Sequence, residues 1–251
     1  MITKKCFPVL EFDDNSNALI NPGRNDKFPY SKLVITFFKE VINKLLQENK
    51  IKEYYTVKGE NDLIVYKFCD EDVLLIHGII GCPACGGFLD ELIGYGITDV
   101  MFCGGGGALV KNTDVGNLIV IEKAIRDEGF SYHYVKPSRM IEANTDVIKI
   151  INDYLDKFNI PYKNGITWTT DAFYRETVDK IKLRKEEGAV IVEMEQSGLI
   201  AVSQFRNIKY GAIIYTGDDV SSDVWDNRDW KSRESVRYNL VEICKEITKL
   251  L

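Results

Sequence analysis

The stretch VIVEMEQSGL, residues Val190–Leu199, joins an expected strand to an expected helix, and the rest of the chain is organised around it. Three residues of high strand propensity, Val190–Val192, run directly into Glu193, Met194 and Glu195. Two carboxylates at such a junction are costly to bury unless something binds them. Either one glutamate faces a polar ligand such as the hydroxyls of a polyol, or both acids occupy a solvated helix start, where the helix dipole favours them. These residues alone leave the two interpretations equal.

Extended and helix-like apolar patterns alternate along the whole chain and are joined by short connections. Such alternation predicts an α/β fold, with a central mixed, mostly parallel sheet flanked by helices. No linker, repeat or low-complexity stretch interrupts residues 1–251, so we predict a single domain over that range. The expected strands cover residues 63–68, 73–77, 98–103, 114–121, 162–169, 190–192 and 210–215, and the expected helices cover 31–49, 87–95, 144–158 and 230–250, with a further charged helix ending at 187.

The composition argues against several classes of partner. Hydrophobic residues make up 45% of the 251 residues, enough for a substantial core, and the net charge is −6. This balance disfavours nucleic acid as a partner, because such binders need a concentrated basic face. No apolar run approaches the length of a membrane span, and residues 1–12 lack the apolar centre of a signal peptide. We therefore expect a cytoplasmic protein with no membrane partner.

The cysteines predict neither a disulfide framework nor a metal site. Six cysteines in a cytoplasmic chain of this size favour free thiols. The pair Cys82 and Cys85 has the spacing of a redox motif or of half a zinc site. A second such pair is missing and the sequence has two histidines, so we predict no metal site. Glycines on both sides of the pair, Gly81 and Gly86, favour a tight loop there.

Four polar or glycine-rich segments fall at the carboxyl ends of expected strands, where open α/β sheets bind their ligands. Four consecutive glycines, Gly104–Gly107, follow one strand. They either let backbone N–H groups approach an anion or let the sheet pack closely against a neighbour. The other three segments are Asp171–Phe173, Glu193–Glu195 and Gly217–Asp219. Together they predict a small-molecule site.

The order and spacing of these segments resemble the nucleoside phosphorylase superfamily over nearly the whole chain. Val192–Glu195 (VEME) resembles the family's most specific signature, at its ribose site. Gly104–Leu109 (GGGGAL) resembles the phosphate loop, and Gly81–Cys85 followed by Glu91 resembles the family's glycine-proline loop and its helix. Thr216–Asp218 is similar to the serine-aspartate that faces the base in purine-specific members.

The resemblance implies a role for each candidate site residue. Glu195 would hold the ribose hydroxyls, and Asp218 would share or donate a proton to the leaving base. Either Arg228 or Arg233 would pair with Asp218. The implied sets are Glu193, Met194 and Glu195 for ribose; Phe173 and Asp218 for the base; Asp218 and Arg228 for catalysis; and Gly23, Arg24, Lys27, Gly104 and Gly105 for phosphate.

The chain departs from the family at the phosphate side. Phe102 stands where phosphorylases usually carry an arginine, and Gly105 stands where a serine or threonine is usual. The N-terminal histidine of purine-type members is missing. The glutamine and arginine of pyrimidine-type members are also missing, and Arg175 is the nearest candidate.

The resemblance implies phosphate-dependent cleavage of the N-glycosidic bond of a nucleoside, giving the free base and a pentose 1-phosphate. Phosphate would be the co-substrate, with no cofactor, in a homo-oligomer such as a dimer or hexamer. Asp218 favours a purine, while the segments Arg126–Tyr134 and Trp168–Thr177 resemble a uridine phosphorylase-like branch and favour a pyrimidine.

Two other functions stay open. A nucleosidase would use water in place of phosphate and would need an N-terminal acid, for which Glu11 is the one analogue. A non-catalytic nucleoside-binding protein would keep Glu195 and Asp218 without turnover.

Overall fold

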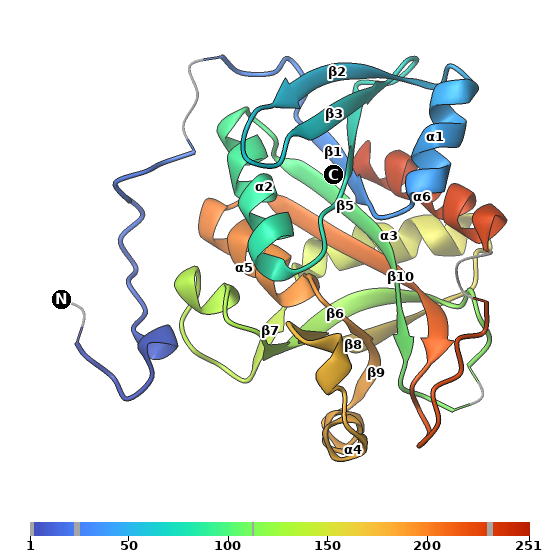
Figure 1. Ribbon diagram of the computed structural model, residues 1–251. Helices are drawn as coiled ribbons and strands as arrows, with labels where there is room; N and C mark the ends of the chain where they lie inside the picture. Colours follow the sequence, from blue (N-terminus) through green and yellow to red (C-terminus); the bar gives the residue numbers. More distant parts are fainter. Residues whose placement is uncertain (1–2, 23–25, 112, 230–232) are drawn as a thin grey trace.

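The computed structural model describes residues 3–22, 26–111, 113–229 and 233–251, and it confirms the expected α/β fold. Strands from the whole chain form one mixed sheet, and helices cover both of its faces (Figure 1). Residues 3–22 form an extended N-terminal segment that runs along the outside of the molecule. In the part of the chain that the structure describes, no helix is long and apolar enough to cross a membrane, and no group of three or more His, Cys, Asp or Glu side chains is arranged to hold a metal ion.

The strands close into a ring with an outer extension. Those of the described residues are β1 (Lys32–Thr36), β2 (Ile51–Val57), β3 (Leu63–Phe68), β4 (Val73–His77), β5 (Asp99–Ala108), β6 (Leu118–Asp127), β7 (Met140–Glu142), β8 (Tyr162–Thr170), β9 (Ala189–Glu193) and β10 (Lys209–Asp219). Their order is β10-β6-β8-β9-β5-β1-β4-β3-β2, with β7 beside β6. Because β10 also pairs with β5, the first five strands of this order form a closed ring.

The helices cover the two faces of the sheet in separate groups. They are α1 (Lys39–Gln47), α2 (Cys82–Gly94), α3 (Thr145–Lys157), α4 (Val178–Glu186), α5 (Gln196–Arg206) and α6 (Glu234–Thr248), with short 3-10 turns η1 (Pro8–Leu10), η2 (Ser131–His133) and η3 (Phe173–Arg175). Buried side chains of α2 and α5 share one apolar cluster, while those of α1, α3 and α6 share the other. A smaller cluster at one end of the ring includes Ile181 of α4 and Trp168 of β8.

The predicted α3 is confirmed, including its start. Its N-cap is Asn144, whose side-chain oxygen accepts hydrogen bonds from the backbone N–H groups of Asp146 (2.9 Å) and Val147 (3.3 Å). Such a cap satisfies donors that have no partner within the helix, so the Asn144 signal carried real structural information.

The predicted helix over residues 31–49 is wrong in its first half. Lys32–Thr36 is the central strand β1, and α1 begins only at Lys39. Leu33, Val34 and Ile35 are all fully buried, because β1 is covered on both faces. A continuous apolar run of this kind looks the same in a buried strand and in a buried helix.

Other boundaries also moved, and two further strands, β2 and β7, were not predicted. α2 begins at Cys82, not residue 87, so Cys82 and Cys85 lie on the first turns of a helix and not in a tight loop. β6 begins and ends later than predicted, and α6 begins at Glu234. Both β5 and β10 continue through the polar segments that were expected to follow them.

Candidate functional site

The junction between β9 and α5 is built on the carboxylate of Glu193. Its Oε2 accepts hydrogen bonds from the backbone N–H groups of Glu195 (2.6 Å) and Gln196 (2.7 Å). Its Oε1 accepts from the hydroxyls of Thr169 (2.6 Å) and Thr167 (3.0 Å) on β8. Four donors from the protein fill this carboxylate. Glu193 therefore holds the turn and is not placed to bind ribose as predicted.

Glu195 is the N-cap residue of α5, and its side chain contacts the start of a second helix, α2. Its Oε1 accepts a hydrogen bond from the backbone N–H of Gly81 at 2.7 Å, and Gly81 is the N-cap residue of α2. The side chain is 6% exposed, and burial together with the neighbouring charge of Glu193 raises the pKa of its carboxyl. Met194, between the two buried glutamates, is partly exposed. The turn thus directs Met194 and the Glu195 carboxyl away from the Glu193 network.

The two cysteines of α2 are packing residues. Cys82 and Cys85 are both buried, and burial raises the pKa of each thiol. The Sγ of Cys82 donates to the backbone oxygen of Glu195 at 3.5 Å and packs against Gly198 of α5. A thiol with a raised pKa is a poor nucleophile, so burial disfavours redox chemistry at both cysteines, and Cys82 links the starts of α2 and α5.

The four glycines lie within β5, where their small size is required by packing. A Cβ on Gly105 would come within 2.9 Å of the Tyr215 ring, and one on Gly106 would come within 2.7 Å of the Val192 backbone oxygen. The close-packing interpretation is therefore correct for these positions. Still, β5 pairs with β1 only as far as Cys103 and with β9 only from Gly107. Among the described strands, the edge at Gly104–Gly106 has no partner on that side.

Replacing Gly106 with alanine tests this packing. The added Cβ would meet a backbone oxygen of β9, which cannot rotate away. We expect the free energy of unfolding to fall by about 1–3 kcal/mol, as for other overpacked sites. Denaturant unfolding measures this change. Gly87→Ala is the matched control, because nothing lies within 4 Å of its Cβ. That substitution should raise stability by up to about 1 kcal/mol through helix propensity. Equal effects of the two substitutions would contradict the argument.

Of the predicted N-terminal phosphate ligands, the structure describes Lys27. Gly23 and Arg24 lie outside the described residues. Lys27 donates a hydrogen bond to the backbone oxygen of Gly94 at 2.5 Å, at the carboxyl end of α2. Glu195 contacts the opposite end of this helix of 13 residues, which is about 20 Å long at 1.5 Å per residue. Within one chain, Lys27 is therefore far from Glu195, and its role in phosphate binding stays a prediction.

Aromatic side chains fill the place where phosphorylases carry an arginine. The Phe102 ring is 2% exposed, and its centroid lies 5.6 Å from that of Phe37, which follows β1. The Phe102 ring is also the group that a Cβ on Gly104 would meet. The Arg126 guanidinium is used elsewhere, since it donates at 2.8 Å to the hydroxyls of Ser131 and Ser138. This side of the site therefore offers backbone N–H groups and aromatic rings.

Asp218 lies near the end of β10, the strand that pairs with the opposite edge of β5. One carboxylate oxygen is 3.6 Å from the position of a Cβ on Gly107. The other accepts a hydrogen bond from the indole N–H of Trp225 at 2.7 Å. The predicted pairing with Arg228 is wrong, because Arg228 pairs with the adjacent Asp219 and donates to the backbone oxygen of Thr113 at 2.5 Å.

The guanidinium of the alternative partner, Arg233, reaches the backbone oxygen of Arg228 at 3.4 Å. Arg228 therefore holds the loop that follows β10. A backbone bridge between Asp219 and Asp226 closes the same loop. These contacts tie Arg228 to the loop that carries Trp225, and the catalytic role of Arg228 stays a prediction.

Two side chains near Asp218 were not predicted from the sequence. Trp225 donates to it, and Glu176 lies close enough for the charge of Asp218 to act on it. Burial and that charge raise the pKa of Glu176 to about 7. Glu176 belongs to the segment Trp168–Thr177 that carries the family resemblance, but spacing alone does not show which side chain of a loop turns inward. Phe173, the predicted base ligand, is half exposed beside Tyr174, with ring centroids 4.1 Å apart.

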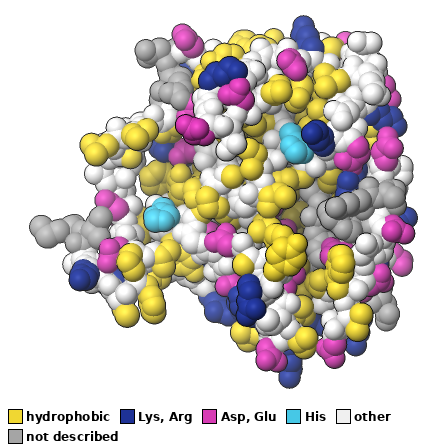
Figure 2. Space-filling model, viewed as in Figure 1, with side chains coloured by type: hydrophobic (Ala, Val, Ile, Leu, Met, Phe, Trp, Pro, Cys, Tyr) yellow, Lys and Arg dark blue, Asp and Glu magenta, His cyan; other side chains and the backbone are white. Residues whose placement is uncertain are grey.

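The surface around these elements is largely apolar. Hydrophobic side chains gather over the middle of the view in Figure 2, where α2, β5 and β8 lie in Figure 1. The exposed aromatic residues include Phe173, Tyr174 and Trp225. Such a rim suits the flat, apolar faces of a nucleobase.

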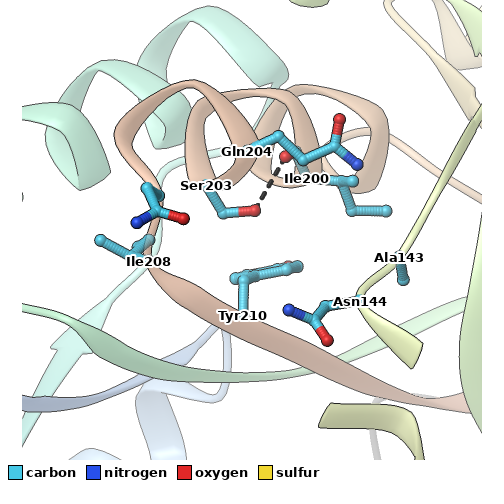
Figure 3. Close-up of a pocket in the computed structure, with 8 residues that line it drawn as sticks. Ala143, Asn144, Ile200, Ser203, Gln204, Ile208 and Tyr210 are labelled. Atoms are coloured by element: carbon cyan, nitrogen blue, oxygen red, sulfur yellow. Dashed lines mark hydrogen bonds between the residues drawn. The ribbon is translucent and has the colours of Figure 1, made fainter. Parts of the chain in front are cut away.

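A separate surface pocket of about 210 Å³ lies between α5 and the start of α3 (Figure 3). It is lined by Ala143, Asn144, Ile200, Ser203, Gln204, Asn207, Ile208 and Tyr210. Several of its polar groups are already bonded to the protein: Ser203 donates to the Ile200 backbone oxygen at 2.8 Å, and Gln204 donates to the Glu142 backbone oxygen at 2.7 Å. Tyr210 lies near the start of strand β10, whereas Asp218 lies near the opposite end of that strand. This pocket is therefore distinct from the strand-end site.

Comparison with known proteins connects this geometry to a family. A guanosine phosphorylase of Halorubrum lacusprofundi is 25% identical over 175 residues, 66% of this chain and 71% of that protein. A purine nucleoside phosphorylase of the DeoD type from Shewanella oneidensis is 24% identical over 204 residues, 80% of this chain and 84% of that protein.

Solved structures share the fold at lower identity. The uridine phosphorylase of Vibrio fischeri matches with a TM-score of 0.72 at 20% identity, over 89% of this chain and 97% of that one. A 5'-methylthioadenosine/S-adenosylhomocysteine nucleosidase of Helicobacter pylori matches with a TM-score of 0.72 at 16% identity, over 89% and 100% of the two chains. The family model of the phosphorylase superfamily matches residues 32–251. The chain therefore belongs to the phosphorylase superfamily, whose members include nucleoside phosphorylases and nucleosidases.

Proposed function

We propose that this protein cleaves the N-glycosidic bond of a purine nucleoside with phosphate as the acceptor, releasing the free base and a pentose 1-phosphate. One observation carries the proposal. The backbone edge at Gly104–Gly106 is unpaired between β1 and β9, the turn after β9 carries Glu195, and Asp218 at the end of β10 lies 3.6 Å from the Cβ position of Gly107. A sugar, a base and an anion each have a matching group around that edge.

The division of labour follows from the charge that develops as the bond breaks. The sugar becomes cation-like, so a carboxylate on its hydroxyls and a phosphate beneath its ring both stabilise it. Glu195 supplies the first, and the backbone N–H groups of Gly104–Gly106 hold the second. The departing base gains electron density and needs a proton, which acids near Asp218 provide.

The relatives support a phosphorylase, and a homo-oligomer would complete the site. The two sequence relatives described above are named phosphorylases of purine nucleosides or guanosine. Because Phe102 replaces the usual arginine and Lys27 lies elsewhere, a cation from a neighbouring subunit would supply the missing charge. We therefore include a homo-oligomer, located in the cytoplasm, in the proposal.

A nucleosidase is the second candidate, and the aromatic pair Phe37 and Phe102 favours it. Apolar rings in the place of a phosphate-binding arginine suit an enzyme that uses water. The predicted water-activating acid does not support it, however. Glu11 follows η1 in the N-terminal segment and accepts a hydrogen bond from the backbone N–H of Lys5 at 2.8 Å.

Phosphate dependence decides between the two. We expect release of guanine from guanosine to rise at least about a hundredfold when millimolar phosphate is added to phosphate-free buffer, because an oriented nucleophile lowers the barrier. The assay follows base release by absorbance and identifies the sugar product as ribose 1-phosphate. Equal rates without phosphate, with free ribose as product, would establish the nucleosidase. Binding of guanosine without release of base would leave a nucleoside-binding protein.

A further inference from the structure

Glu176 is turned inward from an otherwise exposed segment. Every other residue from Asp171 to Asp179 is exposed, whereas the Glu176 side chain is partly buried. Its position is set by the turn η3, because the Glu176 N–H donates to the Phe173 backbone oxygen at 3.2 Å. A lone carboxyl that points inward from a polar loop is costly unless it serves a partner or a ligand.

The helix after Glu176 is fixed to the loop after Asp218. Lys185, near the end of α4, donates to the Ser221 backbone oxygen at 2.9 Å. Ile181 of α4 belongs to the apolar cluster on which Val220 packs. These contacts hold the η3–α4 segment against the end of β10, and Asp218 is the charged group that acts on Glu176 there.

The two carboxyls have different surroundings. An indole N–H from Trp225 contacts one oxygen of Asp218 at 2.7 Å, and such a donor suits an ionised carboxylate. Glu176 loses solvation and faces the negative charge of Asp218, and both effects raise its pKa to about 7. Glu176 is therefore the carboxyl that can carry a proton near neutral pH.

We propose that Glu176 touches the purine base and is the acid that gives it a proton, while Asp218, held by Trp225, is the neighbouring carboxyl group. This inference rests on the proposed function and deepens it, because it reassigns the proton from Asp218 to Glu176. The ligand class is a purine nucleoside whose base leaves with a proton on N7.

The step balances without any further reactant. The C1'–N9 bond breaks, and its electron pair goes to the base. The O–H proton of Glu176 moves to N7, so the base leaves neutral. An oxygen of phosphate forms the new bond to C1', and the Glu176 carboxylate regains a proton from water before the next turnover. The rate therefore needs protonated Glu176 and falls as the pH rises through its pKa, which burial and Asp218 raise to about 7.

The experiment compares guanosine with 7-methylguanosine, whose base already carries a methyl group and a positive charge on its imidazole ring and so needs no proton. In Glu176→Gln the amide keeps the size of the side chain but has no acidic proton. At pH 6 with phosphate, we expect kcat/KM for guanosine to fall about a hundredfold or more, the usual contribution of a positioned acid. For 7-methylguanosine it should change less than about threefold, and the alkaline limb of the guanosine pH profile should disappear. Glu186→Gln, the same change on an exposed residue of α4, should leave both substrates and the profile unchanged.

Each other outcome overturns the inference in a recognisable way. If Glu176→Gln lowers turnover of both substrates equally, Glu176 serves binding or shape and not proton transfer. If Glu176→Gln keeps guanosine turnover while Asp218→Asn loses guanosine and keeps 7-methylguanosine, Asp218 is the acid. If the unsubstituted protein releases no base from either nucleoside, the proposed function fails first and the inference fails with it.

Discussion

Glu195→Gln is expected to lower kcat/KM for ribonucleosides about a hundredfold or more, the range found when one preorganised charge-stabilising group is lost. The fold should survive, because the glutamine oxygen can still accept the hydrogen bond from the Gly81 N–H that Glu195 now accepts at 2.7 Å. What disappears is the negative charge opposite the developing sugar cation. Turnover of inosine in saturating phosphate, with circular dichroism as a check of the fold, measures both parts of the prediction.

The sugar itself provides the control for Glu195. A 2',3'-dideoxynucleoside lacks the hydroxyls that the carboxylate would hold, so the same substitution should cost it far less than it costs inosine. Because burial and Glu193 raise the pKa of Glu195, its ionised fraction grows with pH, and nucleoside affinity should increase as the pH rises. Glutamine should remove that dependence. Equal losses on both substrates, or an unfolded variant, would assign Glu195 to the capping of α2 alone.

The sequence predicted the class of fold because strands and helices of ordinary length alternate, and this signal is local. The prediction of single elements failed where a strand is buried on both faces, because the alternation of apolar and polar side chains is then missing. The predicted helix over Lys32–Thr36 is wrong because both faces of β1 are covered, so its side chains show no alternation. The ends of β5 and β10 were placed too early because glycines and acids are typical of loops, yet here the ring of strands continues through them.

The positions of candidate site residues were predicted correctly where a local motif fixes the backbone. They were predicted wrongly where contacts between segments distant in sequence place the side chain. Val190–Leu199 does place Glu195 at a strand end beside another helix start. By contrast, the sequence left Arg228 or Arg233 as the partner of Asp218, and in the structure Arg228 pairs with Asp219, in the loop that the bridge between Asp219 and Asp226 closes. Lys27 was predicted from a local glycine turn, but its partner Gly94 is 67 residues away in sequence.

The roles of the two glutamates in the VEME motif could not be separated from sequence, and the structure separates them by their donors. Glu193 receives two backbone N–H groups and two hydroxyls, so it joins β8, β9 and α5 at one point. Glu195 receives a donor from α2 across the site. Glu193 therefore acts on function indirectly, because its hydrogen bonds fix the turn that holds Glu195 in place.

Glu193→Ala is expected to lower the free energy of unfolding by about 3–5 kcal/mol, because it strips a buried network that is left with unsatisfied donors. The N–H groups of Glu195 and Gln196 and the hydroxyls of Thr167 and Thr169 would all lose their acceptor. Urea unfolding followed by circular dichroism measures the loss. It is a large share of the roughly 5–15 kcal/mol that stabilises a typical domain.

Two further variants make the Glu193 prediction specific. Glu193→Gln keeps one acceptor oxygen, so its cost should be smaller, about 1–3 kcal/mol, since one pair of donors then faces an NH₂ group. Glu186→Gln on the exposed end of α4 should change stability by less than about 0.5 kcal/mol. A Glu193→Ala variant as stable as the unsubstituted protein would mean that water or a shifted turn satisfies these donors. The position of Glu195 would then rest on its contact with Gly81 alone.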